Sequence, residues 1–212
     1  MALYLPDLNA VFVHVPKAGG TWVREALAAS GIRTLPAGGV GEHNLPDAYA
    51  VKGRRFAFVR NPVDWYESAW RGLSQGWPAR REVAALHRER SWSPIRFLTY
   101  LAGERDFGGF CETILREQPG FASRMFEWFI GPPGYPKVEF VGRMESLAAD
   151  LAAILRWLGW EGVLADVSAA NAAEQPRPTW EPGLRNRITA AESFGLSRWY
   201  AGAASPFRIT VE

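Results

Sequence analysis

The sequence predicts an α/β protein, a three-layer sandwich around a central, mostly parallel β-sheet. Apolar strands at residues 10–15 and 55–60 are each followed closely by a helical pattern. A third apolar strand at 138–141 precedes an amphipathic helix at 145–158. Repeated strand–loop–helix units of this kind indicate parallel strands joined by crossover helices. The 212 residues fit a single domain, residues 1–212.

Composition narrows the classes of partner and compartment. The net charge of +2 is too small to indicate a nucleic-acid partner, so any anion site must be local. The one cysteine, Cys111, excludes an internal disulfide, and we expect it to be a buried apolar residue. No N-terminal signal pattern is evident and no apolar run has the length of a membrane span. These features favour a cytoplasmic protein without a membrane span.

The first strand is apolar at nearly every position, which predicts burial on both faces. A helix is expected from Thr21 to Ala29, with Gly31 as its C-cap. Residues 32–35 read as a short second strand. Residues 36–46 form a glycine-rich loop without periodicity.

The strand at 55–60 leads directly into a second helix. Asn61 is a favoured N-cap, Pro62 suits the first helical position, and Asp64 lies in the first turn. We expect this helix to end between Gly72 and Gln75.

Residues 76–136 lack strand–helix regularity and are interpreted as an inserted helical lid that forms an acceptor pocket. Helices are expected near 81–89, 94–101 and 121–129, and residues 103–119 have a mixed pattern. After the helix at 145–158, a last helix is predicted from residue 183 to about 194, with a further turn at 197–200.

The loop after the first strand has the composition of an anion site. Gly19 and Gly20 allow close approach of the backbone to a ligand, and the following helix presents unpaired N–H groups. In a Walker A loop the lysine follows the glycines, whereas Lys17 precedes them here. The loop is therefore P-loop-like with a displaced lysine. Lys17 would lie near the strand end, where a cation can stabilise a leaving oxygen.

A second anion site is predicted after the next strand. Arg60 ends that strand, and Ser68 lies two turns into the following helix. A guanidinium fork and a hydroxyl donor suit one phosphate group. Open α/β sheets bind ligands at the carboxyl ends of their strands, where both predicted sites fall.

These motifs resemble those of sulfotransferases that use 3′-phosphoadenosine 5′-phosphosulfate (PAPS). The segment 16–22, Pro-Lys-Ala-Gly-Gly-Thr-Trp, looks like their 5′-phosphosulfate loop, and Arg60-Asn61-Pro62 with Ser68 is similar to their 3′-phosphate site. Residues 141–147 resemble a later strand-to-helix segment of the family. The resemblance implies a P-loop NTPase-like fold and sulfuryl transfer from PAPS, without a metal, to a hydroxyl or amine of a small-molecule or carbohydrate acceptor.

The resemblance also implies roles for single residues. Lys17 would be catalytic by stabilising the leaving phosphate oxygen, and Trp22 would pack on adenine. Arg60 and Ser68 would hold the 3′-phosphate. The implied nucleotide-binding set is Lys17, Ala18, Gly19, Gly20, Thr21, Trp22, Arg60 and Ser68.

The general base is assigned separately, because proton transfer near neutral pH suits histidine. His43 lies in the loop between the two phosphate motifs, and a catalytic histidine occupies a similar place in carbohydrate sulfotransferases. Glu25 and Glu42 are the alternatives, since some family members use glutamate. His14 lies in the first strand and is expected to be structural, and His87 reads as a solvated helix residue.

Several alternatives stay open at this point. Arg143, Arg177, Arg185 and Arg187 fit either nucleotide contacts or ordinary surface pairs. A P-loop small-molecule kinase and a non-catalytic nucleotide-binding protein are the rival functions. The displaced lysine and the lack of an evident Walker B acid argue against the kinase. The aromatic residues of the insert suit a sugar, a phenol or a lipid equally.

Overall fold

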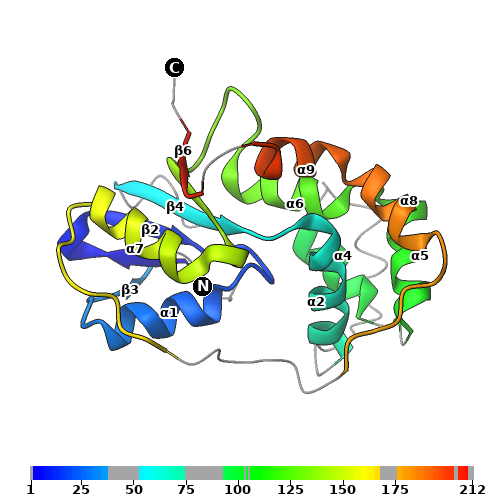
Figure 1. The fold of residues 1–212 in the computed structure, drawn as a ribbon, viewed down its shortest axis with the longest axis horizontal. Helices are drawn as coiled ribbons and strands as arrows, with labels where there is room; N and C mark the ends of the chain where they lie inside the picture. Colours follow the sequence, from blue (N-terminus) through cyan, green and yellow to red (C-terminus); the bar gives the residue numbers. More distant parts are fainter. Residues whose placement is uncertain are drawn as a thin grey trace. The chain divides into compact units, whose positions relative to one another are not determined.

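A computed structural model describes residues 2–37, 53–74, 93–102, 104, 106–167, 176–202 and 205–209. Within these ranges the chain is α/β, as predicted, with a six-stranded mixed sheet in the order β3-β1-β2-β4-β5-β6 (Figure 1). The strands are β1 (Leu3–Leu5), β2 (Ala10–Val13), β3 (Leu35–Pro36), β4 (Arg54–Val59), β5 (Phe140–Arg143) and β6 (Phe207–Arg208).

The centre of the sheet is parallel and its edges are antiparallel. β2 pairs in parallel with β4, and β4 with β5, whereas β1, β3 and β6 run antiparallel to their neighbours. All four residues of β2 are buried, as are the last four of β4. A strand covered on both faces loses its polar alternation, which is why the apolar runs identified these strands.

The chain forms two compact units. The first consists of Met1–Asn61, Phe126–Ala172 and Gly202–Glu212, and it contains the sheet. The second consists of Pro62–Met125 and Ala173–Ala201. Its described elements are helices. It contains residues 76–125 of the predicted insert and adds 62–75 and 173–201, whereas residues 126–136 of that insert belong to the first unit.

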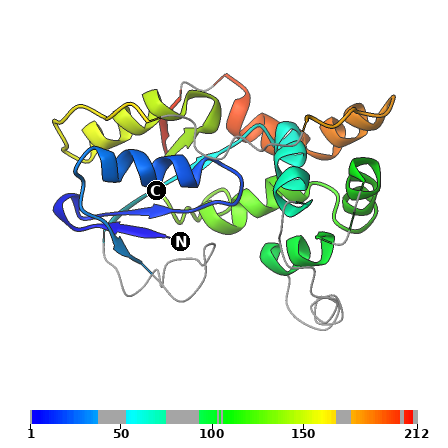
Figure 2. The ribbon, with the colours of Figure 1, turned by 90° about the horizontal axis from the view of Figure 1, so that it is seen from below.

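Two helices of the first unit lie on the same face of the sheet (Figures 1 and 2). They are α1 (Gly20–Ala29) and α7 (Leu147–Trp157), the latter preceded by the 3-10 turn η2 (Met144–Ser146). A second 3-10 turn, η1 (Pro6–Leu8), joins β1 to β2. α1 ends as predicted, because Gly31 has a φ of 71° and Ile32 N–H donates to Leu27 O at 3.0 Å.

The second unit contains α2 (Pro62–Ser74), α4 (Pro94–Leu101), α5 (Phe107–Glu117), the start of α6 (Phe121–Ile130), α8 (Leu184–Ala191) and α9 (Ser193–Tyr200). α2 packs on α5 and α8. Its core is aromatic: the ring of Phe121 lies 5.6 Å from that of Trp65 and 4.8 Å from that of Phe97. Large buried aromatic rings are a main source of apolar contact area in a core of this size.

A buried carboxylate organises the second unit. Glu192 is 0 % exposed and accepts hydrogen bonds from Tyr66 Oη at 2.6 Å and from the N–H groups of Ala122 and Ser123 at 3.0 and 2.9 Å. These two N–H groups belong to the first turn of α6, where backbone N–H groups find no acceptor within the helix. Burial and the charge of Glu192 raise the pKa of Tyr66. Glu192 thus caps α6 from a distant part of the sequence.

The position of Glu192 also corrects the predicted last helix. The prediction of one helix from residue 183 to about 194 is wrong, because α8 ends at Ala191 and α9 begins at Ser193. The break falls at Glu192, whose side chain reaches α6. A continuous amphipathic pattern does not reveal a break that a tertiary contact imposes.

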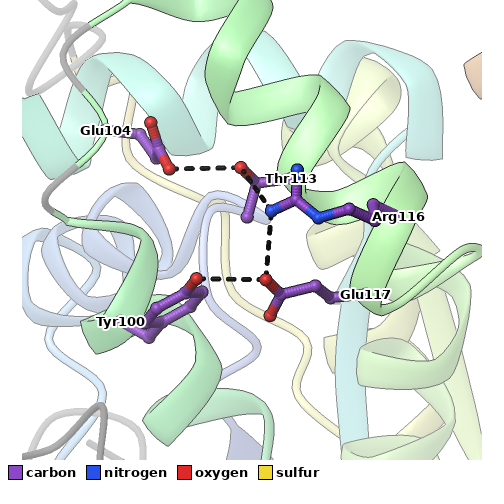
Figure 3. A network of polar contacts seen from close by, with 5 residues as sticks. All are labelled: Tyr100, Glu104, Thr113, Arg116 and Glu117. Atoms are coloured by element: carbon purple, nitrogen blue, oxygen red, sulfur yellow. Dashed lines mark hydrogen bonds and ion pairs between the residues drawn. The ribbon is translucent and has the colours of Figure 1, made fainter.

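A smaller polar network joins α4 and α5 on a more exposed part of this unit (Figure 3). Glu117 accepts from Tyr100 Oη and from Arg116, each at 3.1 Å, and Thr113 Oγ1 donates to Glu104 at 3.1 Å. Exposed pairs of this kind contribute little to stability, about 0–1 kcal/mol each.

Other boundaries differ from the sequence prediction. The short strand expected at 32–35 is found at Leu35–Pro36, and the strand expected at 138–141 is found at Phe140–Arg143. β1, β6 and α5 were not predicted. The helices near 94–101 and 121–129 are confirmed as α4 and α6, while the one near 81–89 lies outside the described residues. In the ranges that the structure describes, no helix has both the length and the apolar character needed to cross a membrane.

Candidate anion site at the carboxyl ends of the parallel strands

The three parallel strands end at one edge of the sheet, and each carries a cationic residue there. Lys17 follows β2 within the loop 14–19, Arg60 comes directly after β4, and Arg143 is the last residue of β5. The register pairs Val59 with Arg143, so β4 and β5 end at the same level. All three cations belong to the first unit. Three cationic residues at one edge of a sheet favour an anionic ligand there.

The loop after β2 has an unusual backbone. Lys17 has a φ of 62° and Gly19 a φ of 85°, both in the left-handed region. For a lysine this conformation costs about 1–2 kcal/mol, so it persists only where the surroundings hold it. Ala18 between them is buried, and its N–H lies 3.4 Å from Val15 O. Left-handed residues also occur in the backbone turns that bind anions.

Gly19 in the loop and Gly20 at the start of α1 are also required by packing within the protein. A Cβ at Gly20 would lie 2.0 Å from the His14 ring, and one at Gly19 would lie 2.7 Å from Leu147. His14 itself stacks on Phe12, with ring centroids 6.0 Å apart. The expected structural role of His14 fits this packing. The expected approach of a ligand to the glycine backbone stays a prediction.

The N-terminus of α1 has no side-chain cap from its N-cap residue. Gly19 at the N-cap has no side chain, and no side-chain cap forms. The N–H groups of Gly20, Thr21 and Trp22 therefore have no acceptor within the helix. Thr21 is half-buried and contributes a hydroxyl at the same place. These groups are the donors that the sequence assigns to the 5′-phosphate.

Trp22 is held by a segment that follows α7. Its indole N–H donates to Val167 O at 3.2 Å, and Ser30 Oγ accepts from Ala165 N–H at 2.9 Å. Residues 165–167 therefore lie beside α1. The indole is half-buried, and its predicted packing on adenine stays a prediction.

The turn after β4 is held by the turn after β5. Arg60 Nη1 lies 3.1 Å from Met144 Sδ, and Asn61 N–H donates to Glu145 Oε1 at 2.7 Å. α2 then begins at Pro62, as the sequence predicts, with Asp64 in its first turn. The position of Arg60 thus depends on residues 84 positions away in the chain.

A buried carboxylate supports the end of β5. Asp150 is 1 % exposed and accepts from Arg143 N–H at 2.7 Å and from Ser205 Oγ. Asp150 lies on α7, and a Cβ at Gly142 would be 3.0 Å from its Cβ. The end of β5, α7 and the C-terminal segment therefore meet at this carboxylate.

The other candidate residues of the prediction lie in the second unit, outside the described residues or on α1. Ser68 is half-buried on α2 in the second unit, so its pairing with Arg60 stays a prediction. The proposed base His43 and the alternative Glu42 lie outside the described residues, as does His87. Glu25 is half-buried on α1.

The remaining arginines of the prediction belong to the second unit. Arg187 pairs with both oxygens of Glu112 at 2.5 and 2.8 Å, which lowers the pKa of that carboxyl. Arg185 lies 3.4 Å from Asp64, and Arg177 is exposed. These contacts match the interpretation of Arg185 and Arg187 as surface pairs.

Cys111 is buried in the second unit, as expected, and burial raises the pKa of its thiol. No group of three or more acidic, histidine or cysteine side chains able to hold a metal occurs in the described ranges.

Sequence reasoning missed Met144, Glu145 and Asp150 as parts of this edge. The segment 141–147 was singled out only for its resemblance to a strand-to-helix segment. The local sequence did not mark the contacts of these residues, because their partners lie on other elements.

Comparison with protein-family models, with curated proteins and with solved structures finds no match to this chain. The case for function therefore rests on the residues at the carboxyl ends of β2, β4 and β5.

Proposed function

We propose that this protein is a PAPS-dependent sulfotransferase that acts on a hydroxyl or amine of a small-molecule or carbohydrate acceptor. The observation that carries the proposal is the arrangement of Lys17 and Arg60 at the ends of two neighbouring parallel strands, beside an uncapped helix start. A nucleotide with phosphates at its 3′ and 5′ positions fits two such anion sites better than a nucleotide with a single 5′-phosphate chain.

In the proposed reaction the acceptor oxygen or nitrogen attacks sulfur, and the bond between sulfur and the 5′-phosphate oxygen breaks. That bond's electron pair stays on the phosphate, so adenosine 3′,5′-bisphosphate leaves. Lys17 stabilises the charge that develops on the leaving oxygen, and the first-turn N–H groups of α1 bind the 5′-phosphate. The acceptor proton passes to a base, for which His43 is proposed, with Glu25 and Glu42 as alternatives.

Arg60 and Ser68 would bind the 3′-phosphate, Arg60 as a two-pronged donor and Ser68 through its hydroxyl. The same proposal includes the P-loop-like nature of the sheet, a role for the helical second unit as an acceptor lid, and a cytoplasmic location. Fixed cationic donors would take the part that magnesium plays in kinases.

A thermal-shift titration with adenosine 3′,5′-bisphosphate, ATP and ADP, each with and without magnesium, tests the proposal. A ligand that binds only the folded state raises the melting temperature by mass action. We expect the bisphosphate to stabilise the protein most, without a need for magnesium. Magnesium-dependent preference for ATP would indicate the kinase alternative, and indifference to the 3′-phosphate would refute the sulfotransferase proposal. Preference for the bisphosphate without transfer to any acceptor would indicate the non-catalytic nucleotide-binding protein.

A further inference from the structure

Two side chains of one turn contact the segment that carries Arg60. Met144 and Glu145 are consecutive residues of η2, directly after β5. Met144 Sδ lies 3.1 Å from the Arg60 guanidinium, and Glu145 Oε1 accepts the Asn61 N–H at 2.7 Å. One contact is to the side chain of Arg60 and the other to the backbone immediately after it. The position of the guanidinium depends on the backbone at residues 60–61 and on the rotamer of the Arg60 side chain. The two contacts restrain one of these each.

We propose that Glu145 and Met144 are positioning residues for the 3′-phosphate site, with Glu145 fixing the Arg60–Asn61 backbone and Met144 the guanidinium. The inference deepens the proposed function and rests on it for the identity of the ligand. Neither residue touches the ligand in this proposal. Both act through Arg60.

The backbone contact matters because of the residue that follows. Pro62 has no N–H, so Asn61 N–H is the last main-chain donor before the second residue of α2. A carboxylate acceptor makes this a charge-assisted hydrogen bond, which is stronger than one between neutral groups. Asn61 lies two residues beyond the end of β4, and Glu145 restrains its N–H there.

The side-chain contact matters because arginine loses much rotamer freedom when it is ordered. A thioether is a weak acceptor, so it orients a guanidinium without satisfying it. The guanidinium has five N–H donors, so a thioether contact at Nη1 does not by itself use up its capacity to bind a phosphate. A carboxylate at the position of Met144 would instead neutralise the charge that the site needs.

The first experiment follows the Asn61 amide by hydrogen exchange in the full chain without ligand. Glu145→Ala removes the acceptor, so the Asn61 amide should exchange about tenfold faster, the factor that 1.4 kcal/mol represents. Glu145→Gln keeps a carbonyl oxygen at the same place and should restore most of the protection. Glu161→Ala, at an exposed glutamate of the same unit, is the matched control and should leave the amide unchanged. Equal exchange in wild type and Glu145→Ala would overturn the inference whatever the ligand is.

The second experiment measures the affinities for adenosine 3′,5′-bisphosphate and adenosine 5′-monophosphate by titration calorimetry. The ratio of the two affinities reports the 3′-phosphate site alone. Glu145→Ala should lower this ratio about fivefold to tenfold, because the backbone at Asn61 is no longer held. Glu145→Gln should stay near the wild-type ratio, because its amide oxygen still accepts the Asn61 N–H. Met144→Leu, which keeps the volume but removes the sulfur, should lower the ratio by a smaller factor.

The outcomes separate the two proposals. A wild-type ratio near one would refute the proposed function, while the exchange experiment would still decide whether Glu145 holds Asn61. A high wild-type ratio that Glu145→Ala leaves unchanged would refute the positioning role and leave the function standing. An equal loss of both affinities in Glu145→Ala would show a general structural effect and would also refute the positioning role.

Discussion

Replacing Lys17 by glycine separates the stability of the loop from its proposed chemistry. Lys17 has a φ of 62°, where a residue with a side chain pays about 1–2 kcal/mol relative to glycine. Glycine regains this energy but costs about 0.5–1 kcal/mol through the greater freedom of the unfolded chain. The net expectation is a Lys17→Gly variant that is as stable as wild type or about 1 kcal/mol more stable.

Activity should move in the opposite direction. Removal of one preorganised charge or donor at a reacting centre lowers kcat by roughly 10²–10³-fold. Lys17→Gly should therefore transfer sulfate at least about a hundredfold more slowly while keeping its fold. Lys17→Ala is the matched control, because it loses the same amine but keeps the left-handed backbone strain. It should be less stable than Lys17→Gly by about 0.5–1 kcal/mol and equally inactive.

The assays are urea unfolding for stability and transfer of labelled sulfate from PAPS to an acceptor found by screening phenols, alcohols, amines and sugars. A glycine variant less stable than the alanine variant would contradict the reasoning from backbone strain. Sulfate transfer within about threefold of the wild-type rate would contradict the catalytic role of Lys17.

Three further predictions concern packing and burial. Glu192→Gln should lower the free energy of unfolding by about 2–4 kcal/mol, because the buried donors around it lose a carboxylate acceptor. Glu181→Gln, at an exposed site, should change it by under about 0.5 kcal/mol, and equal effects in urea unfolding would contradict the cap on α6. Gly20→Ala should cost about 1–3 kcal/mol because its Cβ meets His14, and His14→Ala in the same chain should recover part of that loss. Cys111 should resist a thiol reagent at pH 8 until the chain unfolds, since burial raises its pKa, and rapid labelling of the folded protein would be inconsistent with that burial.

The parts of the fold that the sequence predicts well are those encoded locally. β2 and β4 are buried on both faces, so their apolar runs are unbroken. Glycines before α1 and Asn61-Pro62 before α2 indicate where the following helices begin. β1 and β6 are short strands, three and two residues long, whose formation depends on their neighbours rather than on their own pattern. The mixed pattern at 103–119 hid α5, since glycines 108 and 109 lie in its first turn, where Asp106 accepts from Gly109 N–H at 2.6 Å.

The same distinction holds for the candidate site: residues in continuous motifs were predicted, and residues that act across elements were not. Lys17, Gly19 and Arg60 lie in motifs that are continuous in the sequence. Glu145 binds the residue that follows Arg60, so its role appears only when β4 and β5 are known to be neighbours. Asp150 binds the end of β5 and Ser205 of the C-terminal segment, so its role appears only when α7 is seen beside both. Contacts of that kind have no local signature in a single sequence.

The central claim is that the edge formed by β2, β4 and β5 binds a nucleotide through a separate 3′-phosphate site at Arg60. Titration calorimetry of wild type and Arg60→Ala with adenosine 3′,5′-bisphosphate and adenosine 5′-monophosphate tests it most directly. We predict that wild type binds the bisphosphate at least about tenfold more tightly, since a guanidinium–phosphate contact is a strong charge-assisted one, and that Arg60→Ala abolishes the preference. Equal affinity of wild type for the two nucleotides, or an unchanged preference in Arg60→Ala, would contradict the claim.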